Sequence, residues 1–399
     1  MNRLKQKFPI FNKYPDWVYL DNAATTQKPL EVINRLHDFH QFENANIHRG
    51  VYHLSNLTSS NYELVRTIAA QFLQAPDANC IGFTAGTTDS INTLAHGLIS
   101  HLVSPGDNLV ISISEHHGNF IPLQQLAQQK QASLRIIPVD ERGDISLEIL
   151  EQNIDDRTRL VSVQHLSNTL GTLHPIKEII ELAHQKSVPV LIDAAQSAAI
   201  YDLHWRELQY DFLAFSGHKI FGPFGTGVLF IAPPFHSQFK PYRFGGGIVK
   251  DVQAYHSTFT SYPNVLDVGT PNISGVIGMG AAIEFLMSQD RAIWIQHLND
   301  LTAYALKELS SISGIQIIGN PTKRASIISF NVEGIHPHEV ASFLNQDQIA
   351  VRAGLHCTQP LLSHFNLYST VRVSFSIYNQ KADVDRLVDS LLELKKFWS

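Results

Sequence analysis

The sequence predicts an α/β protein with a mainly parallel sheet covered by helices on both faces, followed by a smaller α+β domain. The first observation is an alternation of apolar, strand-like runs with segments of helical length and pattern. These runs lie at residues 109–113, 134–139, 160–165, 188–193 and 210–215. The second observation is a later change of pattern. Residues 325–332 and 370–377 alternate like half-buried antiparallel strands, and residues 383–397 are patterned as a terminal helix.

The same periodicities predict the remaining elements. Residues 18–21 form a short apolar strand, followed by a polar turn at 22–26. A strand at 80–84 leads through a tight turn at 85–88 into a helix at 89–102, and a long helical region covers 274–310 with a break near 288–290. A helix over residues 61–73 carries Leu64, Val65, Ile68, Ala69, Phe72 and Leu73 on one face.

Composition narrows the class of protein. The 399 residues are 44% hydrophobic and 17% charged, which is typical of a globular chain with a large core. A formal net charge of -6 argues against a nucleic-acid binder, and the chain has neither a run of membrane-span length nor a signal-peptide core near its first residues. We therefore expect a cytoplasmic protein that binds no nucleic acid and no membrane.

The cysteines and histidines give no sign of a disulfide framework or a metal site. Cys80 and Cys357 are the two cysteines and lie far apart in the sequence. The 20 histidines occur without Cys-x-x-Cys or His-Glu-x-x-His spacing, so we expect no bound metal.

Four polar clusters follow strand-like runs. They lie at residues 115–119, 167–168, 193–196 and 216–219. Ligands of parallel sheets bind beyond the carboxyl ends of the strands, so these clusters are expected to face one crevice.

Lys219 is the residue around which a site can be built. Taken alone, a lysine is usually a solvated surface group. At the mouth of a sheet, burial would lower its pKa and let the amine form a Schiff base with an aldehyde cofactor. Pyridoxal phosphate is such a cofactor, and it also needs a carboxylate, a stacking group and a phosphate cradle.

Candidates for these roles occur in the polar clusters. Asp193 closes a buried run, where a carboxylate needs a cation such as a protonated pyridine nitrogen, although it could also cap a helix. His116 is flat enough to stack on a ring, and on spacing alone His117 could do the same. Gln196 and Asn168 could donate to the ring oxygen, or could serve as turn or cap residues.

A second group of residues could hold a phosphate. The Gly-Thr-Thr turn that precedes the helix at 89–102 offers backbone N–H groups and the hydroxyls of Thr87 and Thr88. Simple helix capping by either threonine would explain the same residues. Ser216 and His218 are further donors, and Gly217 would let the backbone approach closely.

Read together, these motifs resemble the fold-type I, class V aminotransferase-like enzymes, and among them the cysteine desulfurase and selenocysteine lyase group. The matching stretches are YLDNAA at 19–24, IHRG at 47–50, GTT at 86–88, EHH at 115–117, SN at 167–168, DAAQ at 193–196, SGHK at 216–219, GTPN at 269–272 and RAGLHC at 352–357. The resemblance implies a large pyridoxal-phosphate domain at 16–284 with a seven-stranded type of sheet. Residues 1–15 and 285–399 would form the small domain that carries the cysteine loop.

The resemblance also implies roles for individual residues. Lys219 matches the Schiff-base lysine, Asp193 the partner of the pyridinium, His116 the stacking histidine and Gln196 a donor to the ring oxygen. The implied phosphate ligands are Thr87, Thr88, Ser216 and His218, together with Thr270, which would reach the phosphate of a partner subunit and so implies a homodimer with shared active sites. Arg372 matches the arginine that clamps the substrate carboxylate, and His48, Asn168 and Arg352 are the other expected substrate-binding residues.

Cys357 decides the subtype that the resemblance implies. It lies in a glycine-rich polar loop, whereas Cys80 lies in an apolar strand. As a thiolate it would attack the sulfur of L-cysteine, leaving L-alanine and a persulfide on Cys357. The compact loop at 352–357 is similar to that of relatives that rely on a SufE-like acceptor protein, which points to iron-sulfur cluster assembly. Selenocysteine lyase activity on L-selenocysteine is a further expectation.

Some positions depart from the family pattern. Leu355 stands where relatives often carry histidine or glutamine, Ala85 where an arginine is common, and Asn22 where serine is frequent. Two alternatives to the desulfurase stay open: another class V enzyme, such as an aminotransferase or β-eliminating lyase in which Cys357 is incidental, and a non-catalytic protein that keeps only the fold.

Overall fold

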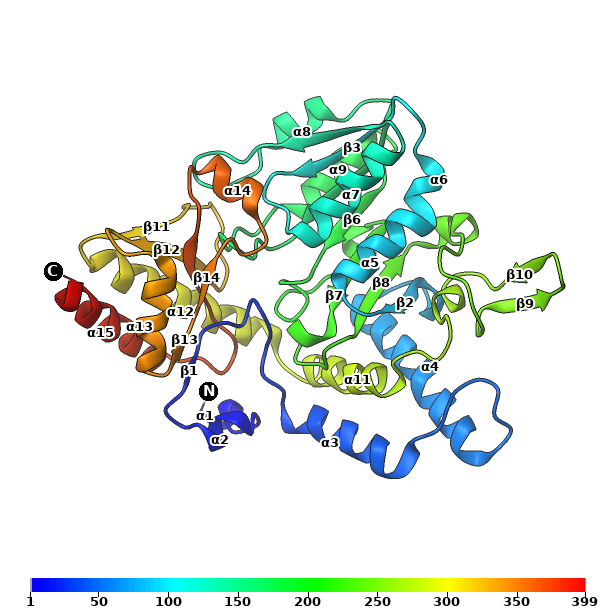
Figure 1. Ribbon diagram of the computed structural model, residues 1–399, viewed down its shortest axis with the longest axis horizontal. Helices are drawn as coiled ribbons and strands as arrows, with labels where there is room; N and C mark the ends of the chain where they lie inside the picture. The colour runs from blue at the N-terminus through cyan, green and yellow to red at the C-terminus, as the bar shows by residue number, and fades with distance from the viewer. Residues whose placement is uncertain (1, 399) are drawn as a thin grey trace.

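A seven-stranded sheet forms the centre of the molecule in a computed structural model that describes residues 2–398 (Figure 1). Its strand order is β2-β8-β7-β6-β5-β3-β4. The strands are β2 (Ile81–Thr84), β3 (Asn108–Ser112), β4 (Ser133–Ile137), β5 (Thr158–Gln164), β6 (Val190–Asp193), β7 (Phe212–Ser216) and β8 (Gly227–Ile231). β8 runs antiparallel to both β2 and β7, and the other pairs are parallel. The predicted mainly parallel α/β fold is confirmed.

Alternating side chains bury both faces of this sheet. In β7, Leu213 and Phe215 pack into one core, whereas Phe212 and Ala214 pack into the other. The first core contains α4 (His53–Leu73), α9 (Ile176–Gln185) and α11 (Ile273–Met287), and the second contains α5 (Thr87–Leu94) and α7 (His117–Gln129). Every second residue of a strand therefore points toward α5 and α7.

The second structural unit is a four-stranded antiparallel sheet of order β11-β12-β15-β14. Its strands are β11 (Ile315–Ile317), β12 (Ile327–Val332), β14 (Arg352–Gly354) and β15 (Thr370–Ser374). They share a core with α12 (Arg291–Ser311), α13 (Pro337–Gln346) and α15 (Lys381–Trp398). Beside it, β1 (Val18–Tyr19) pairs in parallel with β13 (Ile349–Ala350).

The strands β9 and β10 form a hairpin that projects from the body of the molecule (Figure 1). Shorter elements complete the chain. They are α1 (Asn2–Lys5), α2 (Ile10–Lys13), α3 (Leu30–Asp38), α6 (Ser100–Leu102), α8 (Leu147–Asn153), α10 (Trp205–Leu208), α14 (Gln359–His364), β9 (Val249–Val252) and β10 (Ser257–Phe259). Short 3-10 and π-helical turns lie at Phe39–Glu43, Ala78–Cys80, Ala95–Ile99, Gly217–Lys219, Pro233–Gln238 and Asn264–Leu266.

Element boundaries differ from the predictions in instructive ways. The predicted break in the long helical region is confirmed, because α11 ends at Met287 and α12 starts at Arg291. Leu64 was expected in the buried face of α4 but is 53% exposed, since that face is centred on Ala69 and Leu73 and Leu64 lies beyond its edge at Ile68. The division into domains at 16–284 and 285–399 remains a prediction, and residue 284 falls inside α11.

Candidate active site

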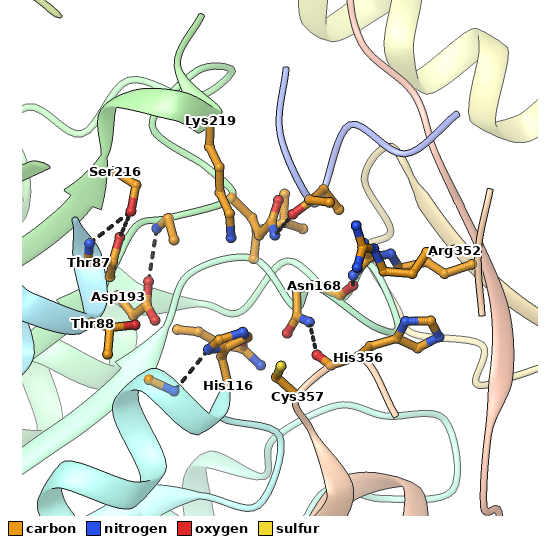
Figure 2. Close-up of a pocket in the computed structure, with 18 of the residues that line it drawn as sticks. Thr87, Thr88, His116, Asn168, Asp193, Ser216, Lys219, Arg352, His356 and Cys357 are labelled. Carbon is orange, nitrogen blue, oxygen red and sulfur yellow. Dashed lines mark hydrogen bonds between the residues drawn. The ribbon is translucent and has the colours of Figure 1, made fainter. Parts of the chain in front are cut away.

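A cavity of about 500 Å³ opens at the carboxyl ends of the parallel strands, between the two sheets (Figure 2). All four of the predicted polar clusters contribute to its lining. The predicted site residues that line it are Thr87, Thr88, His116, Asn168, Asp193, Gln196, Ser216, His218, Lys219, Arg352, Cys357 and Arg372.

Strand alternation explains why several of these side chains point into one space. Ser216 continues the face of Phe212 and Ala214, and Asp193 continues the face of Leu191. Both therefore point toward α5 and α7, where the cavity lies. Gln164, the last residue of β5, follows Leu160 in the same way and also lines the cavity.

Lys219 lies in the single turn Gly217–Lys219 that follows β7. Burial lowers the pKa of its amine to about 8, and the nearby Asp193 carboxylate opposes this change while Arg372 reinforces it. A lysine with such a pKa holds a substantial neutral fraction near neutral pH, which is the form that reacts with an aldehyde.

The backbone before Lys219 is held by an unusual set of donors. The carbonyl oxygen of His218 accepts from Thr25 Oγ1 at 3.0 Å, Thr26 N at 3.1 Å, Thr26 Oγ1 at 3.2 Å and Lys28 Nζ at 3.0 Å. Burial lowers the pKa of Lys28 to about 7. We call residues 25–28 the clamp, because they fix the peptide group from which Lys219 projects.

Asp193 ends β6 and is only 4% exposed. One carboxylate oxygen accepts from Ala195 N at 2.9 Å (Figure 2). Burial raises the pKa of Asp193, whereas the bond from Ala195 and the charge of Lys219 lower it. A buried carboxylate with one hydrogen bond is suited to receive a further cationic partner.

The start of α5 and the end of β7 form a cradle of small polar groups. Ser216 Oγ lies 2.8 Å from Thr87 N and 2.7 Å from Thr87 Oγ1 (Figure 2). Gly86 precedes the helix with a φ of 149°, a conformation that favours glycine. A Cβ on Gly118 would lie 2.6 Å from Thr88 Oγ1, so a side chain there would crowd the cradle. His218 Nδ1 is buried and has no hydrogen-bond partner among residues 2–398.

The two neighbouring histidines have different positions. His116 lines the cavity, and its Nδ1 accepts from Gly118 N at 2.9 Å as the cap of α7. Burial and the nearby Lys219 lower the pKa of His116 to about 3, so its ring is neutral. His117 is not among the residues that line this cavity, and its ring Nε2 instead accepts from Gln359 N at 3.2 Å. The alternative in which His117 stacks on the cofactor therefore finds no support.

Two arginines lie on the side of the cavity formed by the small sheet. Arg372 is 3% exposed and donates to Asn168 O at 3.0 Å and to Asp21 at 3.2 Å. Its Nε is buried, and no residue in the described part of the chain bonds to it. Arg352 binds Asp21 through Nε and Nη2, the shortest contact being 2.8 Å. Desolvation lowers the pKa of Arg372 to about 10, and Asp21 opposes that shift.

Sequence reasoning gave no role to Asp21, Gln164 or His356. Asp21 follows an apolar run directly, which is the signal that singled out Asp193. Gln164 is the last residue of β5, whereas the predicted strand ended at residue 165. A strand end placed one residue earlier would have put Gln164 among the polar residues expected to face the crevice. His356 is buried beside Cys357 and its Nε2 lies 2.9 Å from Thr370 Oγ1, a contact across 14 residues that no local pattern reveals.

Cys357 reaches the cavity from the loop between β14 and α14. Its thiol is exposed, whereas Cys80 is buried. Figure 2 shows the sulfur beside His116, in the space toward which Lys219 also points. The loop is tied to α7 and to the segment after β5, because His117 N donates to Cys357 O at 2.7 Å and Asn168 Nδ2 donates to His356 O at 2.7 Å.

Two predicted site residues lie outside this cavity. His48 is exposed and has a ring nitrogen within 4.8 Å of carboxylate oxygens of Glu63 and Asp267. Thr270 is exposed, and its hydroxyl lies 3.4 Å from Asn46 Nδ2. Their predicted roles therefore cannot be met within this cavity of a single chain.

The fold and this cavity define a class V aminotransferase type of protein, and comparison with known families agrees. The family model for class-V aminotransferases matches residues 18–387, so the chain belongs to that family. A protein of Halalkalibacterium halodurans described as a probable cysteine desulfurase is 41% identical over 400 residues, covering 100% of this chain and 98% of the other.

Solved structures give the same result. The apo structure of a cysteine desulfurase from Thermococcus onnurineus NA1 superposes with a TM-score of 0.94 at 35% identity, covering 99% of this chain and 98% of the other. The cysteine desulfurase CsdA from Escherichia coli superposes with a TM-score of 0.93 at 33% identity, with the same coverage. No helix within residues 2–398 is both long and apolar enough to cross a membrane.

Proposed function

We propose that this protein is a pyridoxal-phosphate-dependent cysteine desulfurase that removes sulfur from L-cysteine, giving L-alanine and a persulfide on Cys357. The observation that carries the proposal is the meeting of an exposed thiol with a low-pKa lysine in one cavity. The full-length similarity to cysteine desulfurases supports the same activity.

The donor set fits pyridoxal phosphate. Lys219 would hold the aldehyde carbon, Asp193 the pyridine nitrogen, and Thr87, Thr88, Ser216 and His218 the phosphate. Within residues 2–398 the buried His218 Nδ1 has no hydrogen-bond partner and could donate to a bound phosphate, and the lack of a side chain at Gly118 leaves Thr88 Oγ1 uncrowded. His116 would stack on the ring, and Gln196, whose amide now donates to Ala23 O at 2.8 Å, would turn to the ring oxygen. When bound, the cofactor supplies an electron sink for bonds at the substrate's Cα.

The substrate carboxylate would bind Arg372. Within the described residues, its buried Nε and the buried Oδ1 of Asn168 have no hydrogen-bond partner, so they could bind the carboxylate and the amino group of an amino acid. Asp21 already accepts a hydrogen bond from Nη2 of Arg372 and another from Arg352. An entering carboxylate would share Arg372 with Asp21, and Arg352 would keep that aspartate in place.

The remaining steps fall to Lys219 and Cys357. Lys219 Nζ moves a proton at the substrate's Cα, which a neutral amine with a pKa of about 8 can accept. The Cys357 thiolate forms a bond to the substrate sulfur as the bond between Cβ and that sulfur breaks. The electron pair stays with Cβ and takes a proton, so cysteine and the enzyme thiol yield alanine and the enzyme persulfide.

The persulfide is proposed to pass to a separate SufE-like acceptor protein that supplies iron-sulfur cluster assembly in the cytoplasm. The exposure of Cys357 at the edge of the cavity supports transfer to an outside thiol. L-selenocysteine would bind the same groups and is proposed as an additional substrate.

We also propose a homodimer with shared active sites, in which Thr270 reaches the phosphate bound by the partner subunit and His48 approaches its substrate. The two residues are exposed and lie on neighbouring segments, since Asn46 contacts Thr270.

The test is to incubate the protein, loaded with pyridoxal phosphate, with L-cysteine and a reductant and to quantify alanine and sulfide together. Equal amounts are expected. Cys357→Ser should remove sulfur release while leaving the absorbance of the bound cofactor unchanged. Unchanged sulfur release by Cys357→Ser would support the alternative class V enzyme, and a protein that binds no cofactor would support the non-catalytic reading.

A further inference from the structure

The cysteine loop has a backbone that its own sequence does not favour. His356 and Cys357 both have positive φ values, 50° and 57°, although neither is glycine. Consecutive non-glycine residues in this left-handed region persist only where their surroundings hold them. The contacts that hold the loop therefore decide where the thiol lies.

His117 holds the loop at Cys357 and just after it. Its backbone N donates to Cys357 O at 2.7 Å, and its ring Nε2 accepts from Gln359 N at 3.2 Å. The second bond also satisfies the first free N–H of α14, which begins at Gln359. One residue thus binds the main chain at Cys357 and two positions later.

The other residues that hold the loop also line the cavity or belong to the buried core. Asn168 binds His356 O but also lines the cavity, and Thr169 meets Thr358 through their hydroxyls at 2.8 Å in the buried core. His117 differs from Asn168 because it is not among the cavity-lining residues. Its ring can therefore be changed without removing a group that faces the cofactor or substrate.

We propose that His117 is the positioning residue for Cys357, holding the cysteine loop against the start of α7 through the acceptor at its ring Nε2. An acceptor at Nε2 requires the proton on Nδ1. Burial lowers the pKa of His117, in agreement with a neutral ring at physiological pH. The inference rests on the proposed function only for its consequence in sulfur transfer, since the loop contacts exist in the protein alone.

Two matched variants isolate the ring acceptor. His117→Phe keeps a flat ring without an acceptor, and His117→Gln places an amide oxygen near the position of Nε2. Hydrogen–deuterium exchange of the peptide covering 355–359 is measured in cofactor-free protein. Exchange in this peptide should rise about tenfold in His117→Phe, and His117→Gln should restore most of the protection. Exchange in the C-terminal half of α7 shows whether the variant is folded. If His117→Phe does not fold, His117→Ala takes its place.

Sulfur transfer supplies the functional readout. In His117→Phe the rate of persulfide formation on Cys357 should fall about tenfold, with the absorbance and affinity of the bound cofactor unchanged, and His117→Gln should recover the rate. Unchanged exchange at 355–359 in His117→Phe, or a His117→Gln variant as slow as His117→Phe, overturns the proposal. Should wild-type protein form no persulfide, the proposed function fails, and the exchange data still decide the role of His117.

Discussion

At the scale of single residues, the site depends on opposite pKa shifts in Lys219 and Asp193, whose charges interact. Burial pushes Lys219 toward its neutral form and also raises the pKa of Asp193. Their mutual attraction opposes both changes without cancelling them. Low-dielectric surroundings thus give a reactive amine, and beside it a carboxyl group suited to a ring cation.

The pKa of Lys219 gives a prediction for cofactor attachment. The unprotonated amine reacts, so the rate at which cofactor-free protein gains the absorbance of attached pyridoxal phosphate should rise about tenfold per pH unit and level off near pH 8. Stopped-flow absorbance between pH 6 and about 10 measures this rate, with Lys219→Ala as the silent control. A rate still rising at pH 10 would mean that Lys219 keeps an ordinary pKa.

Asp193→Asn should weaken cofactor binding and activity but should stabilise the folded protein when no cofactor is bound. Affinity for pyridoxal phosphate should drop, and desulfurase activity should fall by about 100-fold, because the ring cation loses its partner. The cofactor-free variant should be more stable than wild type at pH 7 by on the order of 1 kcal/mol, since a buried charge has been removed.

The pH dependence of that stability difference follows from the raised pKa. The folded protein holds the Asp193 proton more tightly than the unfolded chain does, so the wild type recovers stability as pH falls through the raised pKa. Urea unfolding of cofactor-free protein at two pH values checks the sign. A variant less stable than wild type at pH 7 would show that the carboxylate is already well compensated.

At the scale of elements, the site is assembled from segments whose types were predictable and whose contacts were not. Alternation identified the parallel strands and the strand-end clusters. It could not find β8, because Gly227–Ile231 is a short uniformly buried run that pairs antiparallel with the preceding strand β7 and with β2, which is distant in sequence. The clamp escaped notice for the same reason, since residues 25–28 meet His218 across about 190 residues.

The clamp makes a prediction of its own. Lys28→Met removes one of the donors to His218 O and should lower the free energy of unfolding by about 1 kcal/mol. Because that carbonyl precedes Lys219, the variant should also lose attached pyridoxal phosphate faster. Denaturant unfolding and the decay of cofactor absorbance measure the two effects. Lys7→Met is the control, because Lys7 forms an exposed ion pair with Glu31 and does not contact the clamp. Equal behaviour of the two variants would contradict a role for the clamp.

At the scale of the whole molecule, the cavity belongs to neither sheet alone. The parallel sheet contributes Asp193 and Lys219, and the antiparallel sheet brings Arg372 and Cys357 against them. The motifs predicted most of the residues that line the cavity, because each carries chemistry that the others need, although His48 and Thr270 lie outside it. They could not predict that Asp21 would bind both arginines or that His117 would hold the cysteine loop, since these contacts depend on how the two units pack.

The proposed homodimer is tested at this scale. Light scattering should give a particle of twice the 44.7 kDa chain. Mixing Lys219→Ala chains with Thr270→Ala chains should restore more activity than either variant shows alone, because one site of the mixed dimer would then have both residues intact. A monomer that retains full activity would contradict shared sites.

The central claim is that Cys357 takes the sulfur of L-cysteine. The most direct measurement is mass spectrometry of the protein after a single turnover with L-cysteine, together with the amount of alanine formed. The proposed function predicts one extra sulfur atom on Cys357, none on the buried Cys80, and one alanine for each persulfide. Alanine formed without sulfur on Cys357, or sulfur released equally by Cys357→Ser, would contradict it.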